Sequence, residues 1–145
     1  MAQPYELSLT EAAGAIRSKQ LSPVDLVESL LERTESLEPK LQAWATLVPE
    51  LALEAAREAE AEIAKGGVRG PLHGVPFAAK DIYDTAGIRT AAGSKIWAER
   101  VPDTDAASIA MVKRAGGILL GKAHTSEFAD GDPAPSRNPW NAEHT

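Results

Sequence analysis

Lys80 is the residue of this sequence whose type and position best suit chemistry. It follows the apolar run Val75–Ala79, in which side chains would alternate between the two faces of an extended strand. Because both faces are apolar before the lysine, we expect a buried strand that carries Lys80 at its inner end. Burial disfavours the charged ammonium, and a neutral amine can act as a general base.

The carboxylate of the next residue, Asp81, would oppose this role if it paired with the amine, because a nearby anion favours the ammonium form. Strand alternation directs Asp81 to the opposite face and removes the objection. The spacing alone favours a simpler alternative, a charged strand end with the Lys80 ammonium in water, since strongly perturbed lysines are a minority.

Other residue types that often carry chemistry are not arranged for it. The three histidines, His73, His124 and His144, do not form a HExxH pair or another metal-ligand spacing, so we expect no metal site. We expect His73 to make local hydrogen bonds within its Gly/Pro-rich loop. The segment Gly116–Gly121 has neither the GxGxxG pattern nor the GK[ST] ending of phosphate-binding loops, so we expect no nucleotide cofactor.

The residues offer no clear nucleophile for Lys80 to activate. The sequence has no cysteine and no GxSxG segment, the signature of a serine on a sharp strand-to-helix turn. Thr125 and Ser126 precede Glu127 and are expected to cap a helical turn, a role that hydroxyl side chains favour. On this basis Lys80 would have nothing within the chain to deprotonate.

The elements that position these residues alternate between helix and strand, which predicts an α/β fold. Helical periodicity and capping residues predict four helices: residues 8–20 with Thr10 as N-cap, a helix from an N-cap at Ser22 to Pro39, residues 50–65, and a helix from a cap at Asp103 or Thr104 to Gly116. Strand patterns cover residues 41–48, 75–81 and 118–120. The last is a continuous apolar run, typical of a parallel strand buried on both faces.

The composition is that of one ordinary globular domain of 145 residues. A formal net charge of −6 argues against a nucleic-acid partner, which requires a basic face to neutralise phosphates. No apolar run approaches the length needed to cross a bilayer, and the segment Met1–Glu6 lacks the features of a secretory leader. We therefore expect a cytoplasmic protein without a membrane partner.

Taken together, these segments resemble the amidase signature enzymes. The sequence GPLHGVPFAAKD at Gly70–Asp81 is similar to the family's GPLxGVPxxxKD segment and is the most specific match. Gly121–Ala129 resembles its GKTNxxEF stretch, with His124 where asparagine is common. Arg137–Asn141 is similar to the NPW segment that follows, and Ser22–Val27 to the family's N-terminal helix.

The resemblance implies a mixed sheet flanked by helices and hydrolysis or transfer at a carboxamide through a Ser–cis-Ser–Lys triad, with Lys80 as the triad lysine. It also implies that residues 1–145 are the N-terminal portion of a single amidase domain, which stops before the Gly/Ser-rich segment with the two serines. We therefore expect the chain to be inactive alone. The complete protein is expected to act on a small-molecule amide without a cofactor.

Two alternatives to a plain amide hydrolase remain open. One is the A subunit of glutamyl-tRNA(Gln) amidotransferase, a glutamine-dependent enzyme that needs partner subunits and ATP. The tract Asp130–Ser136 does not look like the corresponding stretch of that protein, and the acidic charge does not favour tRNA binding. The other alternative is a non-catalytic truncated remnant or interaction module. A homo-oligomer is compatible with each of these.

Overall fold

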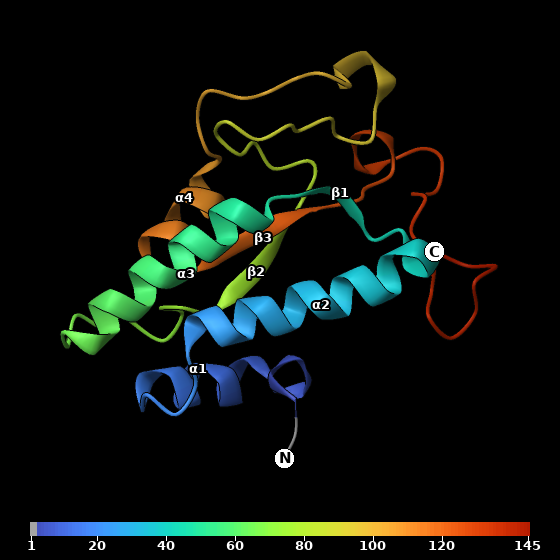
Figure 1. Cartoon of the computed structure of the whole chain (residues 1–145). Coiled ribbons are helices and arrows are strands. Elements are labelled where there is room, and N and C mark those ends of the chain that lie inside the picture. Colours follow the sequence, from blue (N-terminus) through green and yellow to red (C-terminus); the bar gives the residue numbers. More distant parts are fainter. Residues whose placement is uncertain (1–2) are drawn as a thin grey trace. The chain divides into compact units, whose positions relative to one another are not determined.

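The computed structural model describes residues 3–145. Met1 and Ala2 lie outside the described residues. They begin the segment Met1–Glu6, in which we expect no features of a secretory leader. In chain order the helices are α1 (Leu9–Arg17), α2 (Pro23–Leu41), α3 (Pro49–Ala64) and α4 (Ala107–Arg114), and the strands are β1 (Trp44–Leu47), β2 (Pro76–Lys80) and β3 (Ile118–Ala123) (Figure 1). None of the helices within residues 3–145 combines the length and the apolar character that a bilayer crossing requires.

The three strands form one mixed sheet in the order β1-β3-β2. β1 pairs with β3 in antiparallel register, with Thr46 opposite Lys122. β2 and β3 run in the same direction, because Ile118 N donates to Val75 O where both begin and Asp81 N donates to Ala123 O where both end. The expected α/β fold with a mixed sheet flanked by helices is therefore confirmed, and β3 is the central strand.

The chain divides into two compact units. The first contains the chain up to Ser36, Val48–Phe77 and Met111–Leu120, and the second contains Leu37–Leu47, Ala78–Ala110 and Gly121–Thr145. The second unit thus includes the last residues of β2 and of β3. The residues that line the site discussed below belong to this second unit.

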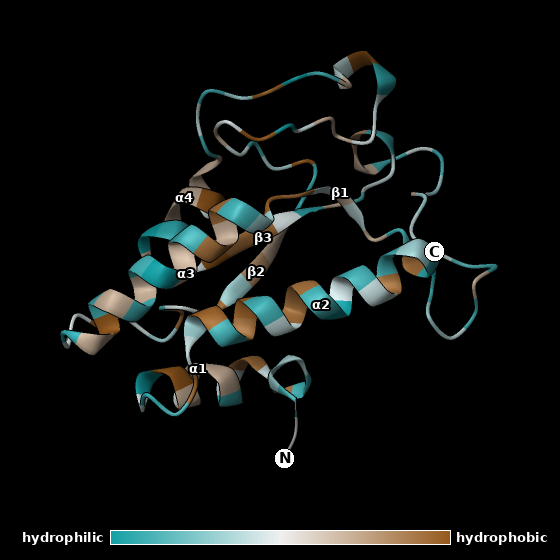
Figure 2. Cartoon of the chain, in the orientation of Figure 1, coloured by the Kyte–Doolittle hydropathy of each residue, from teal (hydrophilic) through white to brown (hydrophobic). Residues whose placement is uncertain are grey.

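The core of the first unit is built from small and medium aliphatic side chains, as expected for a sequence with few aromatic residues. Its buried cluster joins α1, α2, α3 and the residue before β2: Ala12, Ile16, Leu26, Ile63 and Val75. The alternation of hydrophobic and hydrophilic residues along α2 is visible in Figure 2. This is the pattern of a helix with one buried stripe.

The helix starts follow local capping chemistry. Ser22 caps α2 as expected, since its Oγ accepts from Val24 N at 3.0 Å and from Asp25 N at 3.3 Å. The prediction of Thr10 as the N-cap of α1 is wrong, because the cap is Ser8. Ser8 and Glu11 form a capping box, in which each side chain accepts from the backbone amide of the other residue. Thr10 has no acidic residue three positions later to form such a box.

The end of α2 also differs from expectation. Pro39 does not end the helix, which continues to Leu41. Near a helix end a proline removes only one of the last backbone hydrogen bonds. The helix stops where Gln42 adopts a left-handed conformation (φ 47°), and the Glu38 carboxylate accepts from the next two amides, Ala43 N and Trp44 N, each at 3.0 Å.

The connection from β2 to α4 is largely irregular (Figure 1). It is held by side-chain contacts. Arg100 donates two hydrogen bonds to the Asp84 carboxylate, at 2.6 and 2.7 Å, and its guanidinium lies over the Trp97 ring. Trp97 in turn meets the Phe128 ring edge-on, with centroids 5.1 Å apart. These contacts give a segment with little regular structure a defined shape.

Candidate active site

The structure places Lys80 at the last position of β2 with its side chain exposed. The expectation that burial of the strand would desolvate this amine is wrong for the described chain. The alternation itself is correct, because Ala79 and Asp81 are buried while Ala78 and Lys80 are exposed. β2 lies at an edge of the three-stranded sheet, and its face with Ala78 and Lys80 is exposed.

Asp81 faces the other way, as predicted, and is 1% exposed. Its carboxylate pairs with Lys122 of β3, with Oδ1 and Nζ 3.3 Å apart. Its other oxygen, Oδ2, accepts from Ala91 N at 3.1 Å. The backbone of Asp81 is hydrogen-bonded as well: its N–H donates to Ala123 O, and its carbonyl oxygen accepts from Ala92 N. The residue after Lys80 is thus fixed by two neighbouring segments.

Lys122 is completely buried (0% exposed). Its ammonium donates to Tyr83 O at 2.9 Å and to Thr90 Oγ1 at 2.7 Å, and the Asp81 carboxylate completes its surroundings. Burial lowers the pKa of Lys122, and Asp81 opposes that shift. A buried cation is tolerated where it is paired and hydrogen-bonded in this way.

The loops that contain Gly93 and Glu127 meet beside this ion pair and are joined by hydrogen bonds. Ala92 (φ 53°) and Gly93 (φ 68°) adopt left-handed conformations, and Ala92 O accepts from Phe128 N at 2.8 Å. The buried Ser94 Oγ donates to a Glu127 carboxylate oxygen at 2.6 Å. A Cβ on Gly93 would lie 2.6 Å from a backbone carbonyl of the facing loop, so the close approach requires glycine.

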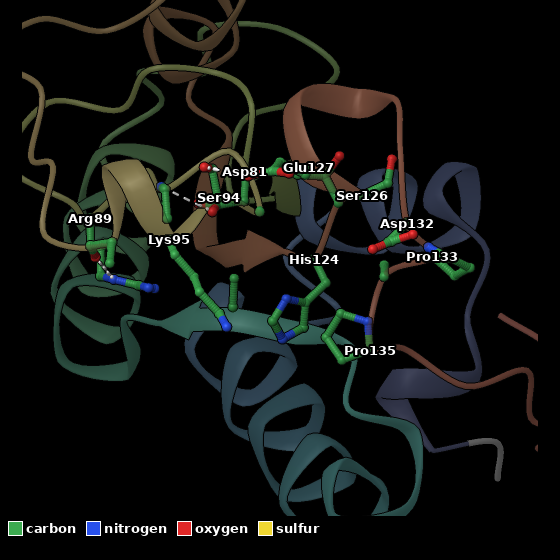
Figure 3. A pocket seen from close by; sticks show the side chains of 16 residues that line it. Asp81, Arg89, Ser94, Lys95, His124, Ser126, Glu127, Asp132, Pro133 and Pro135 are labelled. Atoms are coloured by element: carbon green, nitrogen blue, oxygen red, sulfur yellow. Dashed lines mark hydrogen bonds between the residues drawn. The ribbon is translucent and has the colours of Figure 1, made fainter.

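These loops line a cavity of about 510 Å³. In Figure 3, Arg89 and Lys95 lie on one side of it and Asp132 on the other, with His124 between them. Hydroxyl groups from Ser94 and Ser126 add hydrogen-bonding capacity. Lys80 is not among the residues that line this cavity, although the adjacent Asp81 is.

His73 lies among hydrogen-bonding and charged partners that are close to it in the chain. The buried His73 accepts from Arg69 N through Nδ1 at 3.1 Å, as expected for a local role, and Nε2 lies 3.3 Å from a Glu62 oxygen. Burial lowers the pKa of His73, and the Glu62 charge opposes that shift. Within residues 3–145 no group of three or more His, Asp or Glu side chains is arranged to hold a metal ion.

The expected cap at Thr125 and Ser126 is found only in part. Ser126 occupies the N-cap position of the short turn η3 (Glu127–Ala129), but its side chain makes no capping hydrogen bond. Thr125 is 4% exposed, and its hydroxyl has no hydrogen-bond partner in the described chain.

Sequence reasoning missed Lys122 and the contact between Ser94 and Glu127. A signal for Lys122 was present, because a lysine that continues the apolar run from Ile118 needs a buried counter-charge if the strand extends that far. The loop contact joins residues 33 positions apart and has no comparable signal in a single sequence.

Comparisons with known proteins identify the family of the chain. Residues 25–145 match the sequence model of the Amidase family. The chain is 42% identical over 145 residues to the A subunit of glutamyl-tRNA(Gln) amidotransferase from Carboxydothermus hydrogenoformans. It is also 42% identical over 139 residues to the putative amidase AmiD of Mycobacterium tuberculosis. The alignments cover 96% and 93% of this chain but only 30% and 29% of those relatives.

Solved structures give the same result for the fold. The native peptide amidase from Stenotrophomonas maltophilia superposes with a TM-score of 0.90 at 31% sequence identity, over 99% of this chain and 32% of the amidase. The chain thus spans about 30% of the length of the curated relatives that it matches. The sequence match over residues 25–145 and the shared fold show that the chain belongs to the amidase family, that of the amidase signature enzymes.

Proposed function

We propose that the protein to which these residues belong hydrolyses the C–N bond of a carboxamide and that Lys80 is its general base. The observation that carries the proposal is the position of Lys80. It ends β2 within the segment Gly70–Asp81, its side chain is exposed, and the adjacent Asp81 is turned away and paired with Lys122. An amine in this position is accessible to hydroxyl groups from another part of a larger protein.

The proposed reaction uses two serines, as the resemblance to the family implies. Neutral Lys80 takes a proton from a bridging serine, which takes one from the nucleophilic serine. The nucleophile attacks the amide carbon, the C–N bond breaks, and the leaving amine takes up a proton as an acyl-enzyme forms. Water then attacks the acyl-enzyme, which releases the carboxylic acid and restores the serine.

Both serines would come from a Gly/Ser-rich segment outside residues 1–145, which would then be the N-terminal portion of a single amidase domain. In that case the chain by itself has the base and lacks the nucleophile, and we expect no amide turnover from it alone. Packing of the remaining domain against β2 would also supply the desolvation that Lys80 lacks in the described chain.

A second function is favoured by one observation, the 42% identity to the A subunit of glutamyl-tRNA(Gln) amidotransferase. The same identity to a putative amidase means that overall similarity does not separate the two functions. In the second one, Lys80 would keep its role, and ammonia from an amide such as glutamine would be transferred instead of released. That function would depend on partner subunits and ATP.

The test is amide turnover by the full polypeptide that carries these residues, measured as ammonia released from a panel of small carboxamides. General-base catalysis contributes about 10²–10⁴-fold, so Lys80→Ala should lower kcat by about 10³-fold. Lys40→Ala, which removes an exposed lysine at the end of α2, should leave the rate unchanged and serves as the control. Near-normal rates for Lys80→Ala would refute the assigned role. Turnover that requires ATP and partner subunits would support the amidotransferase.

A further inference from the structure

The two ionisable groups at the end of β2 are consecutive in the chain. Consecutive Cα atoms are about 3.8 Å apart, so the side chains of Lys80 and Asp81 lie within electrostatic range even though they leave opposite faces of the strand. An uncompensated carboxylate at this distance would stabilise the Lys80 ammonium. A general base must instead give up its proton near neutral pH.

Lys122 supplies the compensating charge. Its ammonium is 3.3 Å from Asp81 Oδ1 on the buried side of the sheet, and it is held there by Tyr83 O and Thr90 Oγ1. Because both partners are almost fully buried, solvent does not screen their attraction in the way that it screens surface pairs.

Other charges near this pair balance one another. Asp84 and Arg100 are the further charged groups that act on Lys122, and they form their own bidentate ion pair. Each carboxylate is thus matched to a cation, and the two pairs together carry no net charge. Removal of the Lys122 charge alone would upset this balance.

We propose that Lys122 acts through Asp81 as a positioning residue for the proposed base: it neutralises the carboxylate next to Lys80, so that this carboxylate does not hold Lys80 in its cationic form. The inference rests on the role proposed for Lys80. It assigns Lys122 an effect on the protonation of another side chain, in addition to any contribution to stability.

The test measures the neutral fraction of Lys80 in the 145-residue chain by competitive acylation near neutral pH, read by mass spectrometry. Only the neutral amine reacts, and the exposed Lys40 is the internal reference. In Lys122→Met the labelling of Lys80 should fall about twofold, the effect of one charge at roughly 8 Å in water-like surroundings. Lys122→Gln, which keeps a hydrogen-bond donor without the charge, should show the same decrease.

Three controls separate an electrostatic effect from a structural one. The double variant Asp81→Asn/Lys122→Met has no charge at either position and should restore wild-type labelling of Lys80. In about 1 M salt, where screening acts within about 3 Å, the decrease in Lys122→Met should become smaller, because Lys80 is exposed even though Asp81 is buried. Arg69→Met removes a cation from the Glu62 ion pair of the other unit and should leave Lys80 labelling unchanged.

The proposal is overturned if Lys80 labelling is unchanged in both Lys122 variants, or if the double variant keeps the decrease. It is also overturned if about 1 M salt leaves the effect intact. None of these measurements depends on amide turnover. If Lys80→Ala leaves turnover intact while the labelling results hold, the proposed function fails and the electrostatic coupling stands.

Discussion

The buried ion pair between Asp81 and Lys122 allows a quantitative prediction about stability. Lys122→Met replaces the ammonium by a neutral side chain of similar length. It removes the hydrogen bonds to Tyr83 O and Thr90 Oγ1 and leaves the Asp81 carboxylate, 1% exposed, without its cation. Breaking a buried pair from one side typically destabilises a protein by about 3–5 kcal/mol.

A matched variant makes the prediction specific to burial. Arg100→Met breaks the bidentate pair with Asp84, in which the Arg100 and Asp84 side chains are 32% and 38% exposed. Ion pairs of this exposure contribute about 0–1 kcal/mol, so we expect a much smaller loss. The double variant Asp81→Asn/Lys122→Met should recover part of the stability lost in Lys122→Met, because no unpaired charge remains buried.

Equilibrium unfolding in urea, followed by circular dichroism, measures these free energies. Hydrogen exchange at the Ala91 amide, which donates to Asp81, reports the same change locally and should become faster in Lys122→Met. If Lys122→Met is no less stable than Arg100→Met, the reasoning from burial is refuted. The same holds if the double variant is less stable than Lys122→Met.

Two further predictions concern pH and backbone strain. Because burial keeps the folded-state pKa of His73 below its usual value, the unfolded chain binds the proton first. The free energy of unfolding should therefore fall as the pH drops from about 7 through the range in which histidine titrates, by at most about 1.4 kcal/mol per pH unit. His73→Gln should remove this slope, as measured by urea unfolding at several pH values. Gly93→Ala, with a Cβ 2.6 Å from Thr125 O at φ 68°, should destabilise the chain by about 2–3 kcal/mol, whereas Gly87→Ala, where a Cβ meets nothing within 4 Å, should lose only about 1 kcal/mol in the same measurement. Equal losses would show that the close approach at Gly93 has no energetic weight.

The helices were predictable because their signals are local. The hydroxyl of Ser22, the proline after it and the apolar spacing that follows determine the start of α2 within a few residues. The errors came from competition between neighbouring signals. Ser8 and Thr10 both suit an N-cap, and only Ser8 has an acidic residue three positions later to complete a capping box. Pro39 by itself predicts a stop, but its position in the last turn makes it compatible with the helix.

The environments of the two lysines were not predictable from the strands that carry them. Lys80 follows an apolar run, which predicts burial, yet it is exposed. Lys122 follows another apolar run and is completely buried. The central strand β3 is buried along Ile118–Lys122, whereas the edge strand β2 exposes Ala78 and Lys80. Strand order is set by pairing between distant segments, and residue periodicity does not report it.

The alternation of side chains explains how one short segment can hold two opposite charges in different surroundings. Because successive side chains of β2 point to opposite faces, Asp81 enters the interior beside the central strand, where Lys122 meets it, and Lys80 stays on the face that remains accessible. A shift of the β2 register by one residue would exchange these environments and place the Lys80 ammonium beside Lys122 in the interior. Pairing of Asp81 with Lys122 opposes that shift, since two buried cations side by side are strongly unfavourable. The ion pair therefore favours the register in which Lys80 is accessible, which is the arrangement that the proposed function requires.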